Sequence, residues 1–381
     1  MYRRLLAPAV AAAARQYRAI VLLGPRQSGK TTLARHLFPD FAYVSLEDPD
    51  VRRVALSDPR TLLRDTHTSI ILDEVQRAPE LLSYLQGRLD DPSTQQRFIL
   101  TGSQNLLLAE QVSQTLAGRT RIFSLLPMSH RELVENNVAT QATLDERLFF
   151  GGYPRIFEQQ LNPTEWLAQY TATYVERDVR QLSQVTSLDL FDRYLRLLAG
   201  RAGQLLNLSS LGSDCGVSQP TAAAWLSILK TSYVAFTLEP HFRNFSKRLI
   251  KSPKVYFYDT GLLCYLLRIT TAAHLFSHPL RGAIFENWVV SERVKGFFNQ
   301  GQEAPVYFWR DSKGNEVDLL LDRGLYCDPL EIKSSATFDE SFLLGLARFA
   351  DLQRHPGGEV VFGGDSSFSV SDYHITSWRD I

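Results

Sequence analysis

Cysteine is scarce in this chain. Only three cysteines occur among its 381 residues, and no two of them have the C-x-x-C spacing: Cys215, Cys264 and Cys327. An odd and scattered set argues against a disulfide framework and against a cysteine-rich zinc site. It fits a reducing compartment, so a cytoplasmic protein is expected.

Long apolar runs and an excess of charge are also missing. No apolar run approaches the roughly 18 residues that span a bilayer, so no membrane association is expected. Lys plus Arg and Asp plus Glu number 41 each, which excludes a uniformly basic nucleic-acid coat but allows a local basic patch. The composition, with 44% hydrophobic residues, excludes disorder. The length predicts two to three domains at about 150 residues each.

The first 17 residues, MYRRLLAPAVAAAARQY, allow two interpretations. Two arginines before a short apolar stretch with Ala-x-Ala imitate a signal peptide. The alternative is a first helix that leads into an apolar strand at Ala19–Leu23. We favour the helix because that strand precedes a nucleotide motif.

A phosphate-binding loop follows the strand. Residues 24–32 read GPRQSGKTT and match G-x-x-x-x-G-K-[ST] between a buried-type strand and a helix. Glycines let backbone amides wrap the phosphates, and the helix N-terminus adds its positive end. Lys30 is predicted to reach the β- and γ-phosphates and Thr31 to complete the Mg²⁺ shell. The predicted ATP-binding residues are Gly24, Pro25, Arg26, Gln27, Ser28, Gly29, Lys30, Thr31, Thr32 and Asp73.

The second half of the nucleotide site is predicted in Ser69-Ile70-Ile71-Leu72-Asp73-Glu74. Asp73 would bind Mg²⁺ through water, and Glu74 would act as general base on the attacking water. A further strand, at residues 41–46, is expected between the two motifs. This insertion, together with a glutamate beside the aspartate, is typical of ATPases that carry their own base and argues against a small GTPase.

A polar group is expected beside the γ-phosphate at the end of a later strand, residues 97–101. The strand runs into Gly102-Ser103-Gln104-Asn105. Ser103 or Thr101 is the preferred candidate, and Asn105 is the weaker one.

The motifs also occur in a familiar order. GPRQSGKTT, ILDEVQ, LTGSQ, the AGR that ends at Arg119, and the GGYP of residues 151–154 resemble the prokaryotic AAA-type ATPases with a large uncharacterised C-terminal domain. The resemblance implies ATP hydrolysis and makes Arg119 a candidate phosphate-sensing arginine, within the chain or on a neighbouring copy in a homo-oligomer. Arg121 and Arg177 compete for that role.

The middle of the chain, residues 156–275, is predicted to hold a helical linker and a winged helix-turn-helix. A helix is expected at 162–184, and more helices follow up to Lys230. Gly216 supplies a turn and Ser218 an N-cap. Strand-like stretches at 233–238 and 254–258 complete the wing.

DNA is the expected partner of this middle region, through phosphate contacts. The predicted recognition helix carries only Gln219 and Lys230 as polar candidates for contact, which argues against sequence-specific readout. Between His241 and Tyr258 the chain has five basic residues and no acid: Arg243, Lys247, Arg248, Lys251 and Lys254. Such a segment suits phosphate contact. The alternative is a solvated loop that docks on the ATPase domain.

The last part, residues 276–381, resembles a restriction-endonuclease-like, PD-(D/E)XK core. A helix, a hairpin, a strand and a helix are expected in that order, with Asp318 followed by Glu331-Ile332-Lys333. Residues i and i+2 share a strand face, so Glu331 and Lys333 project together.

Carboxylate oxygens in this pattern suit Mg²⁺ or Mn²⁺. Asp318 and Glu331 are therefore predicted ligands of a second metal, with Lys333 steadying the attacking water and Glu286 adding a further contact. The same residues recur in the C-terminal domains of the resembled family, so their presence does not by itself imply cleavage.

The sequence thus predicts an α/β protein with three domains: a P-loop AAA-type ATPase at 1–155, a winged helix at 156–275 and a nuclease-like domain at 276–381. The expected function is ATP-driven action on nucleic acid, in repair, recombination or defence. One alternative is an ATP-gated switch that works through protein–protein contacts. Another is a DNA-binding regulator whose ATPase sets its oligomeric state.

Overall fold

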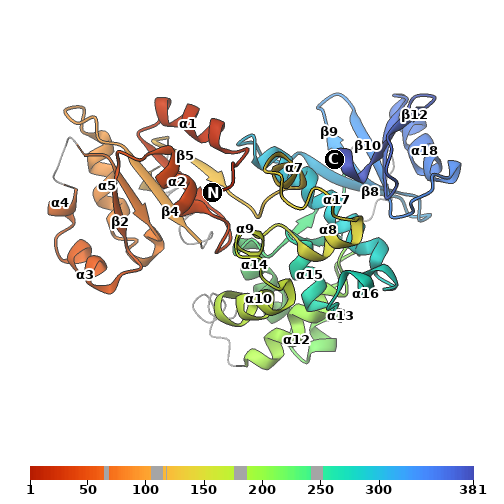
Figure 1. Cartoon of the computed structure of the whole chain (residues 1–381), viewed down its shortest axis with the longest axis horizontal. Coiled ribbons are helices and arrows are strands. Elements are labelled where there is room, and N and C mark those ends of the chain that lie inside the picture. The colour runs from red at the N-terminus through yellow and green to blue at the C-terminus, as the bar shows by residue number, and fades with distance from the viewer. Residues whose placement is uncertain (64–67, 104–114, 117, 176–186, 242–251) are drawn as a thin grey trace. The chain divides into compact units, whose positions relative to one another are not determined.

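The computed structural model describes residues 1–63, 68–103, 115–116, 118–175, 187–241 and 252–381. The chain divides into two compact units (Figure 1). The first comprises Met1–Met128, Thr231–Tyr233 and Phe297–Gln302, and the second comprises Ser129–Lys230, Val234–Gly296 and Glu303–Ile381. The domain boundaries after residues 155 and 275 stay predictions.

The first unit is built on a five-stranded parallel sheet with the strand order β2-β3-β4-β1-β5. Strand β1 is buried at every position, as expected of a parallel strand covered on both faces. The predicted AAA-type α/β sheet is confirmed. Its elements are α1 (Ala7–Gln16), β1 (Ala19–Leu23), α2 (Lys30–Leu37), β2 (Ala42–Ser45), α3 (Pro49–Ser57), α4 (Pro59–Leu62), β3 (Ile70–Asp73), η1 (Val75–Arg77), α5 (Leu81–Asp90), β4 (Phe98–Gly102) and β5 (Thr120–Ser124).

The N-terminal residues form a helix of this unit, as favoured from the sequence. Leu6, Val10 and Ala14 are buried in one apolar cluster with residues of β1 and α2. Arg4, which is 5% exposed, donates hydrogen bonds to the carbonyl oxygens of Ser28 and Leu126, both at 2.7 Å. The N-terminal segment therefore supports the phosphate-binding loop from behind.

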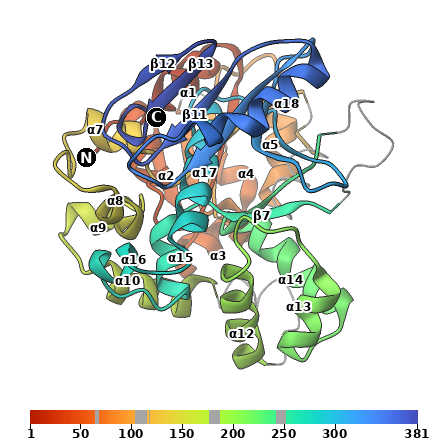
Figure 2. The ribbon, with the colours of Figure 1, turned by 90° about the vertical axis from the view of Figure 1, so that its right-hand side faces the viewer.

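The second unit begins with a helical part. Helices α12, α13 and α14 pack together (Figure 2): the Tyr194 hydroxyl donates to the Ala222 carbonyl at 2.8 Å, and the Phe191 ring lies 5.5 Å from that of Trp225. The antiparallel pair β6–β7 follows. The helix expected at 162–184 is described as far as Val175. The elements are α7 (His130–Glu135), α8 (Leu144–Phe150), α9 (Pro154–Glu158), α10 (Pro163–Tyr170), the π-helical η2 (Thr171–Val175), α12 (Leu188–Ala199), α13 (Leu208–Cys215), α14 (Gln219–Thr231), β6 (Ala235–Leu238), β7 (Lys254–Phe257), α15 (Thr260–Leu266), α16 (Ala272–Phe276) and α17 (Arg281–Phe298).

A six-stranded mixed sheet completes the second unit, with the order β12-β13-β11-β10-β9-β8. Strands β8, β9 and β10 are antiparallel, and β11 returns parallel to β10. Helix α18 covers one face (Figure 2), where Leu346 and Phe349 pack on Trp309 and Val317. The elements are β8 (Val306–Arg310), β9 (Glu316–Asp322), β10 (Cys327–Lys333), η3 (Glu340–Leu343), α18 (Leu344–Gln353), β11 (Gly358–Phe362), β12 (Phe368–Val370), β13 (Tyr373–Ser377) and η4 (Trp378–Asp380).

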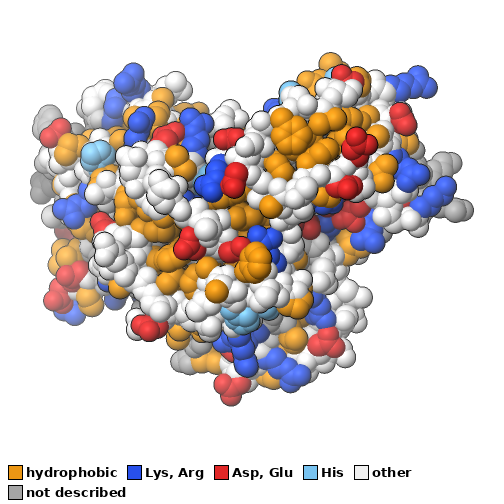
Figure 3. Space-filling view, turned by 45° about the vertical axis from the view of Figure 1, so that its right-hand side comes forward, with side chains coloured by type: hydrophobic (Ala, Val, Ile, Leu, Met, Phe, Trp, Pro, Cys, Tyr) orange, Lys and Arg blue, Asp and Glu red, His pale blue; other side chains and the backbone are white. Residues whose placement is uncertain are grey.

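Charges of both signs are mixed on the surface. On the face drawn in Figure 3, Lys and Arg side chains are interspersed with Asp and Glu side chains, in line with the balanced charge of the sequence. Within the described part of the chain, no helix combines the length and apolar character that crossing a bilayer requires.

Candidate functional site

The phosphate-binding loop joins β1 to α2, and its shape depends on glycine. Gly24 has φ +142°, and a Cβ there would lie 2.2 Å from the Leu125 carbonyl oxygen. Gly29 has φ +95° just before α2 begins at Lys30. The buried Lys30 ammonium donates to the carbonyl oxygens of Gly24 at 3.0 Å and Pro25 at 2.8 Å. Two carbonyl oxygens of the loop therefore hold the Lys30 ammonium against the loop.

Asp73 is the last residue of β3, and its carboxylate accepts hydrogen bonds from hydroxyl groups on three neighbouring elements. Thr31 donates to its Oδ1 at 2.8 Å, Tyr43 donates to its Oδ2 at 2.8 Å, and Thr101 on β4 donates to Oδ1. Burial and the hydrogen bond to Asp73 raise the pKa of Tyr43 to about 12. A cavity of about 530 Å³ has Thr31, Thr32 and Tyr43 in its wall. The Thr31 and Asp73 oxygens together are a donor set that fits Mg²⁺.

Glu74 lies next to this cluster in an unusual backbone conformation. Its φ is +56°, which is rare for a residue other than glycine and is found at functional sites. Its Oε2 accepts hydrogen bonds from Ser103 at 3.1 Å and from Gln76. Its amide nitrogen donates to Thr101 at 3.3 Å. The structure therefore brings together both acidic residues and both preferred polar candidates of β4; Asn105 lies outside the described residues.

Arg119 is not near the phosphate-binding loop of its own chain. It precedes β5, and the β1–β5 register pairs Thr120 with Ala19, at the opposite end of β1 from Gly24. Its guanidinium binds Asp90 instead, with Nη2 to Oδ2 at 2.9 Å. The prediction that Arg119 senses the γ-phosphate within its own chain is therefore wrong. The five residues of the strand, about 16 Å at the usual rise per residue, separate this arginine from the loop. Action on a neighbouring copy stays a prediction.

Of the two competing arginines, the structure describes only Arg121. Arg121 donates to the Gly301 carbonyl at 2.8 Å. Arg177 lies outside the described residues.

The predicted C-terminal residues do come together on β9 and β10. Lys333 contacts Glu331, and its Nζ lies 3.9 Å from Oδ2 of Asp318. That Asp318 oxygen also accepts the Ile332 amide at 2.8 Å. Burial, followed by the nearby charge of Asp318, raises the pKa of Glu331 to about 8.

A lysine that was predicted to contact nucleic acid belongs to this same cluster. Lys254 on β7 is 3% exposed, and its ammonium lies 3.0 Å from Oε1 of Glu286 and also contacts Glu316. Its assignment as a phosphate contact is therefore corrected, because a buried, doubly paired ammonium is not available to a backbone phosphate. The other four basic residues, Arg243, Lys247, Arg248 and Lys251, lie outside the described residues.

Lys254 and Lys333 reduce the need for a metal ion to balance the charge of the C-terminal carboxylates. Glu286, on α17, also accepts the Tyr256 hydroxyl at 2.7 Å, and its pKa is raised by burial and by Asp318. Lys254 and Lys333 already place two cations among the carboxylates. Among the described residues, the one set of three metal-binding side chains whose donor atoms all lie within 4.8 Å of one another is elsewhere. Asp318 and Glu331 as metal ligands stay a prediction.

The GGYP segment has a structural role that the sequence did not reveal. A buried Asp259, the N-cap of α15, accepts the Gly152 amide at 2.7 Å and the Leu262 amide at 2.9 Å. Gly151 has φ +67°, and a Cβ there would lie 2.4 Å from Oδ1 of Asp259. Burial raises the pKa of Asp259. The close approach of the Asp259 carboxylate thus leaves no room for a side chain at Gly151 and engages the amide of Gly152.

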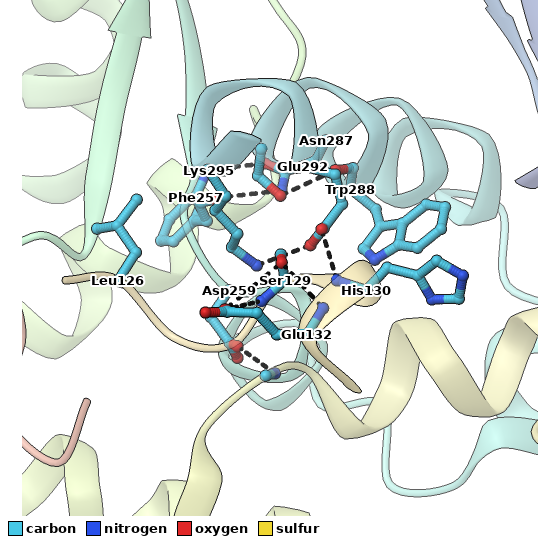
Figure 4. Close-up of polar contacts among 12 residues, drawn as sticks. Leu126, Ser129, His130, Glu132, Phe257, Asp259, Asn287, Trp288, Glu292 and Lys295 are labelled. Carbon is cyan, nitrogen blue, oxygen red and sulfur yellow. Dashed lines mark hydrogen bonds and ion pairs between the residues drawn. The ribbon is translucent and has the colours of Figure 1, made fainter. Parts of the chain in front are cut away.

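A second buried carboxylate lies in the same network (Figure 4). Glu292 of α17 accepts the His130 amide at 2.7 Å and the Lys295 ammonium at 2.8 Å. Asn287 lies five residues before Glu292, and its side chain accepts the Phe257 amide at 2.7 Å and donates to the Phe257 carbonyl at 2.9 Å. Buried polar groups that are paired in this way position α7, β7 and α17 relative to one another.

The comparisons with known proteins agree with the architecture. Family models match three consecutive regions: an AAA domain at residues 16–134, a domain of unknown function (DUF8612) at 141–273 and another (DUF4143) at 281–381. An uncharacterised protein of Mycobacterium tuberculosis is 32% identical over 358 residues, which cover 93% of this chain and 78% of that protein. The chain belongs to this family of AAA-domain proteins.

More distant members and structures are also similar. An uncharacterised protein of Methanocaldococcus jannaschii is 24% identical over 334 residues, 79% of this chain and 71% of that protein. The solved structure of a Walker-type ATPase of Pyrococcus abyssi is 15% identical, covers 68% of this chain and 94% of that chain, and has a TM-score of 0.44.

Proposed function

We propose that this family member binds ATP with Mg²⁺ and hydrolyses it to ADP and phosphate. The proposal rests on the position of four residues at one edge of the parallel sheet: Lys30, Thr31, Asp73 and Glu74. They follow the carboxyl ends of β1 and β3, which lie on either side of β4. The loop amides and Lys30 would hold the phosphates, and Thr31 and Asp73 would hold the cation, which supplies charge neutralisation at the γ-phosphate.

Glu74 is the general base in this proposal. Its carboxylate is held by Ser103 and Gln76 beside the Asp73 cluster, so it can accept a proton from a water aimed at the γ-phosphate. Ser103 and Gln76 position that carboxylate. The sequence motif alone identified Glu74, whereas the contribution of Gln76 comes from the structure.

Nucleotide binding by two variants tests these roles. Lys30→Ala should lose tight ATP binding, because Lys30 is the loop cation predicted to reach the β- and γ-phosphates. Glu74→Gln should bind ATP and retain it unhydrolysed. Glu80→Gln is a matched control, since this glutamate lies after η1 and contacts none of the site residues described above. Rapid turnover by Glu74→Gln, with Glu80→Gln unchanged, would contradict the assignment of the base.

We also propose that the second unit acts on nucleic acid. Support comes from the three packed helices followed by the β6–β7 pair, which is the element order of a winged helix, and from the four basic residues of segment 242–251. Phosphate contact by that segment would be insensitive to sequence and sensitive to salt.

Binding measurements across salt concentrations test the nucleic-acid proposal. Replacing Lys247, Arg248 and Lys251 by Ala should weaken binding to all DNA sequences alike. If each residue contacts a duplex phosphate, the slope of log affinity against log salt should fall by about 2.7. A variant that removes three exposed basic residues elsewhere gives the same change of net charge: Arg53, Lys313 and Arg354. An unchanged slope in the first variant, with no stimulation of ATP turnover by single-stranded, duplex or branched DNA, would favour the protein-contact switch.

The C-terminal sheet is proposed to be a restriction-endonuclease-like core. Helix α17, the antiparallel β8–β10, helix α18 and the parallel β11 follow one another in the required order. Nicking of plasmid or branched DNA with Mn²⁺, abolished by Lys333→Ala and kept by the exposed-site control Lys313→Ala, would support activity. If DNA of all these forms stays intact, the residues serve only the fold.

A further inference from the structure

A histidine, an aspartate and a cysteine from three separate positions meet at one end of the C-terminal sheet. The His241 Nε2 atom lies 3.4 Å from Sγ of Cys327 and 3.8 Å from Oδ2 of Asp322. All three donor atoms lie within 4.8 Å of one another. We propose that His241, Asp322 and Cys327 bind a single zinc-type divalent ion, independently of the nucleotide site.

The distances match the size of such an ion. Zinc bonds of about 2.3 Å to sulfur and about 2.0–2.2 Å to nitrogen or oxygen place tetrahedral ligands about 3.4–3.6 Å apart. The two observed separations, 3.4 and 3.8 Å, bracket that range. For these two pairs, binding requires shifts of only a few tenths of an ångström, and the Asp322 and Cys327 donor atoms lie within 4.8 Å of each other.

The backbone holds all three residues in place. Asp322 and Cys327 are directly opposite each other across the antiparallel β9–β10 pair, so their side chains share a face. His241 is fixed to β8 by its amide, which donates to the Phe308 carbonyl at 2.8 Å. The Gln353 side chain binds both backbone groups of Cys327, at 3.0 and 2.9 Å. A site built on paired strands in this way keeps its geometry without the ion.

Neighbouring groups orient two of the donors. Oδ1 of Asp322 accepts the Gly324 amide at 2.7 Å, and Oδ2 of the same carboxylate lies 3.8 Å from Nε2 of His241. The Tyr307 ring lies edge-on to the imidazole, with 5.5 Å between the ring centres. Contacts of this kind around a metal site fix ligand orientation.

The donor types select the class of ion. A thiolate and an imidazole favour zinc, cobalt or copper over Mg²⁺ and Ca²⁺, which prefer oxygen alone. Cys327 would release its proton to solvent on binding, and the thiolate and carboxylate would then balance the ion's two charges. Three protein ligands leave a fourth position for water, because the Asp322 side chain is 25% exposed while His241 and Cys327 are buried.

Metal content and a cobalt spectrum test the proposal on the full chain without a histidine tag. After removal of metal with a chelator and re-equilibration with zinc, we expect one zinc per chain. Cobalt in its place should give a sulfur-to-cobalt charge-transfer band. That band reports a cysteine ligand and does not arise from cobalt at Asp73 or at the C-terminal carboxylates.

Cysteine variants assign the band. The double variant Cys215→Ser/Cys264→Ser leaves Cys327 as the sole thiol and should keep the band and the zinc. Cys327→Ser should lose the band, and His241→Gln should bind zinc at least about tenfold more weakly. Less than about a tenth of a zinc per chain in the unaltered protein, with no charge-transfer band, would overturn the proposal and leave a thiol–imidazole contact. Because this outcome is read on the unaltered chain, misfolding of a variant does not affect it.

Discussion

The stability of the second unit should depend on pH through Glu331. Burial and the charge of Asp318 raise its pKa from 4.5 to about 8. Between those values the folded chain holds a proton that the unfolded chain has lost, so the free energy of unfolding falls as pH rises through this window. One pH unit corresponds to about 1.36 kcal/mol. From pH 5.5 to 7.5, the titration of Glu331 should therefore lower the free energy of unfolding by roughly 2–3 kcal/mol, and Glu331→Gln should abolish that contribution.

Tryptophan fluorescence isolates the unit in which this change occurs. All five tryptophans, at positions 166, 225, 288, 309 and 378, belong to the second unit. Urea unfolding of the unaltered protein and of Glu331→Gln at several pH values then gives two slopes of unfolding free energy against pH. Their difference reports Glu331 and its interaction with the neighbouring charges, chiefly Asp318. The exposed Glu303→Gln is the control. Any loss of stability that is the same at every pH, such as one caused by losing the Lys333 contact, cancels when the slopes are compared. Parallel slopes for all three proteins would show that Glu331 is already ionised in the folded state at pH 5.5, contrary to this prediction.

Three further predictions follow from close approach and from charge. Gly24→Ala should destabilise the first unit by about 2–4 kcal/mol and abolish ATP binding. Gly87→Ala, which has open space around its Cβ position, should instead stabilise α5 by roughly 0.5–1 kcal/mol. Urea unfolding followed by far-ultraviolet circular dichroism measures both changes. Gly151→Ala should cost about 3 kcal/mol by tryptophan fluorescence, and Gly314→Ala, which has the same sign of φ but no clash, only about 1–2 kcal/mol; equal losses would refute the close-approach account. If Mg²⁺ or Mn²⁺ binds at Asp318, adding it should flatten the pH slope of the unaltered protein, and Asp318→Asn should prevent that change.

The nucleotide site was predictable because its signals are local. The loop, its flanking strand and helix, and the acidic strand end are each read within about ten residues, and parallel strands bring their carboxyl ends together. Thr101 and Ser103 follow from the same rule. Gln76 is less predictable, because only the left-handed backbone of Glu74 turns the chain so that Gln76 reaches back to that carboxylate.

Residues whose roles depend on long-range packing were missed or misassigned. Lys254 looked like part of a basic segment, and its burial is decided by α17 and β9, which come later in the chain. Arg119 carried a family motif, but the β1–β5 register decides which end of the sheet it occupies. The local sequence of Asp259 indicates only a helix N-cap, and its contact with Gly152 joins residues 107 apart. His241 gave no local signal, since Cys327 lies 86 residues away.

Phosphate release by the full chain in the presence of Mg²⁺ and ATP measures the proposed ATP hydrolysis. We expect measurable turnover by the unaltered protein, a fall of about 10²–10⁴-fold in Glu74→Gln, and an unchanged rate in Glu80→Gln. Turnover by Glu74→Gln equal to that of the unaltered protein would contradict the assignment of Glu74 as the base held by Ser103 and Gln76.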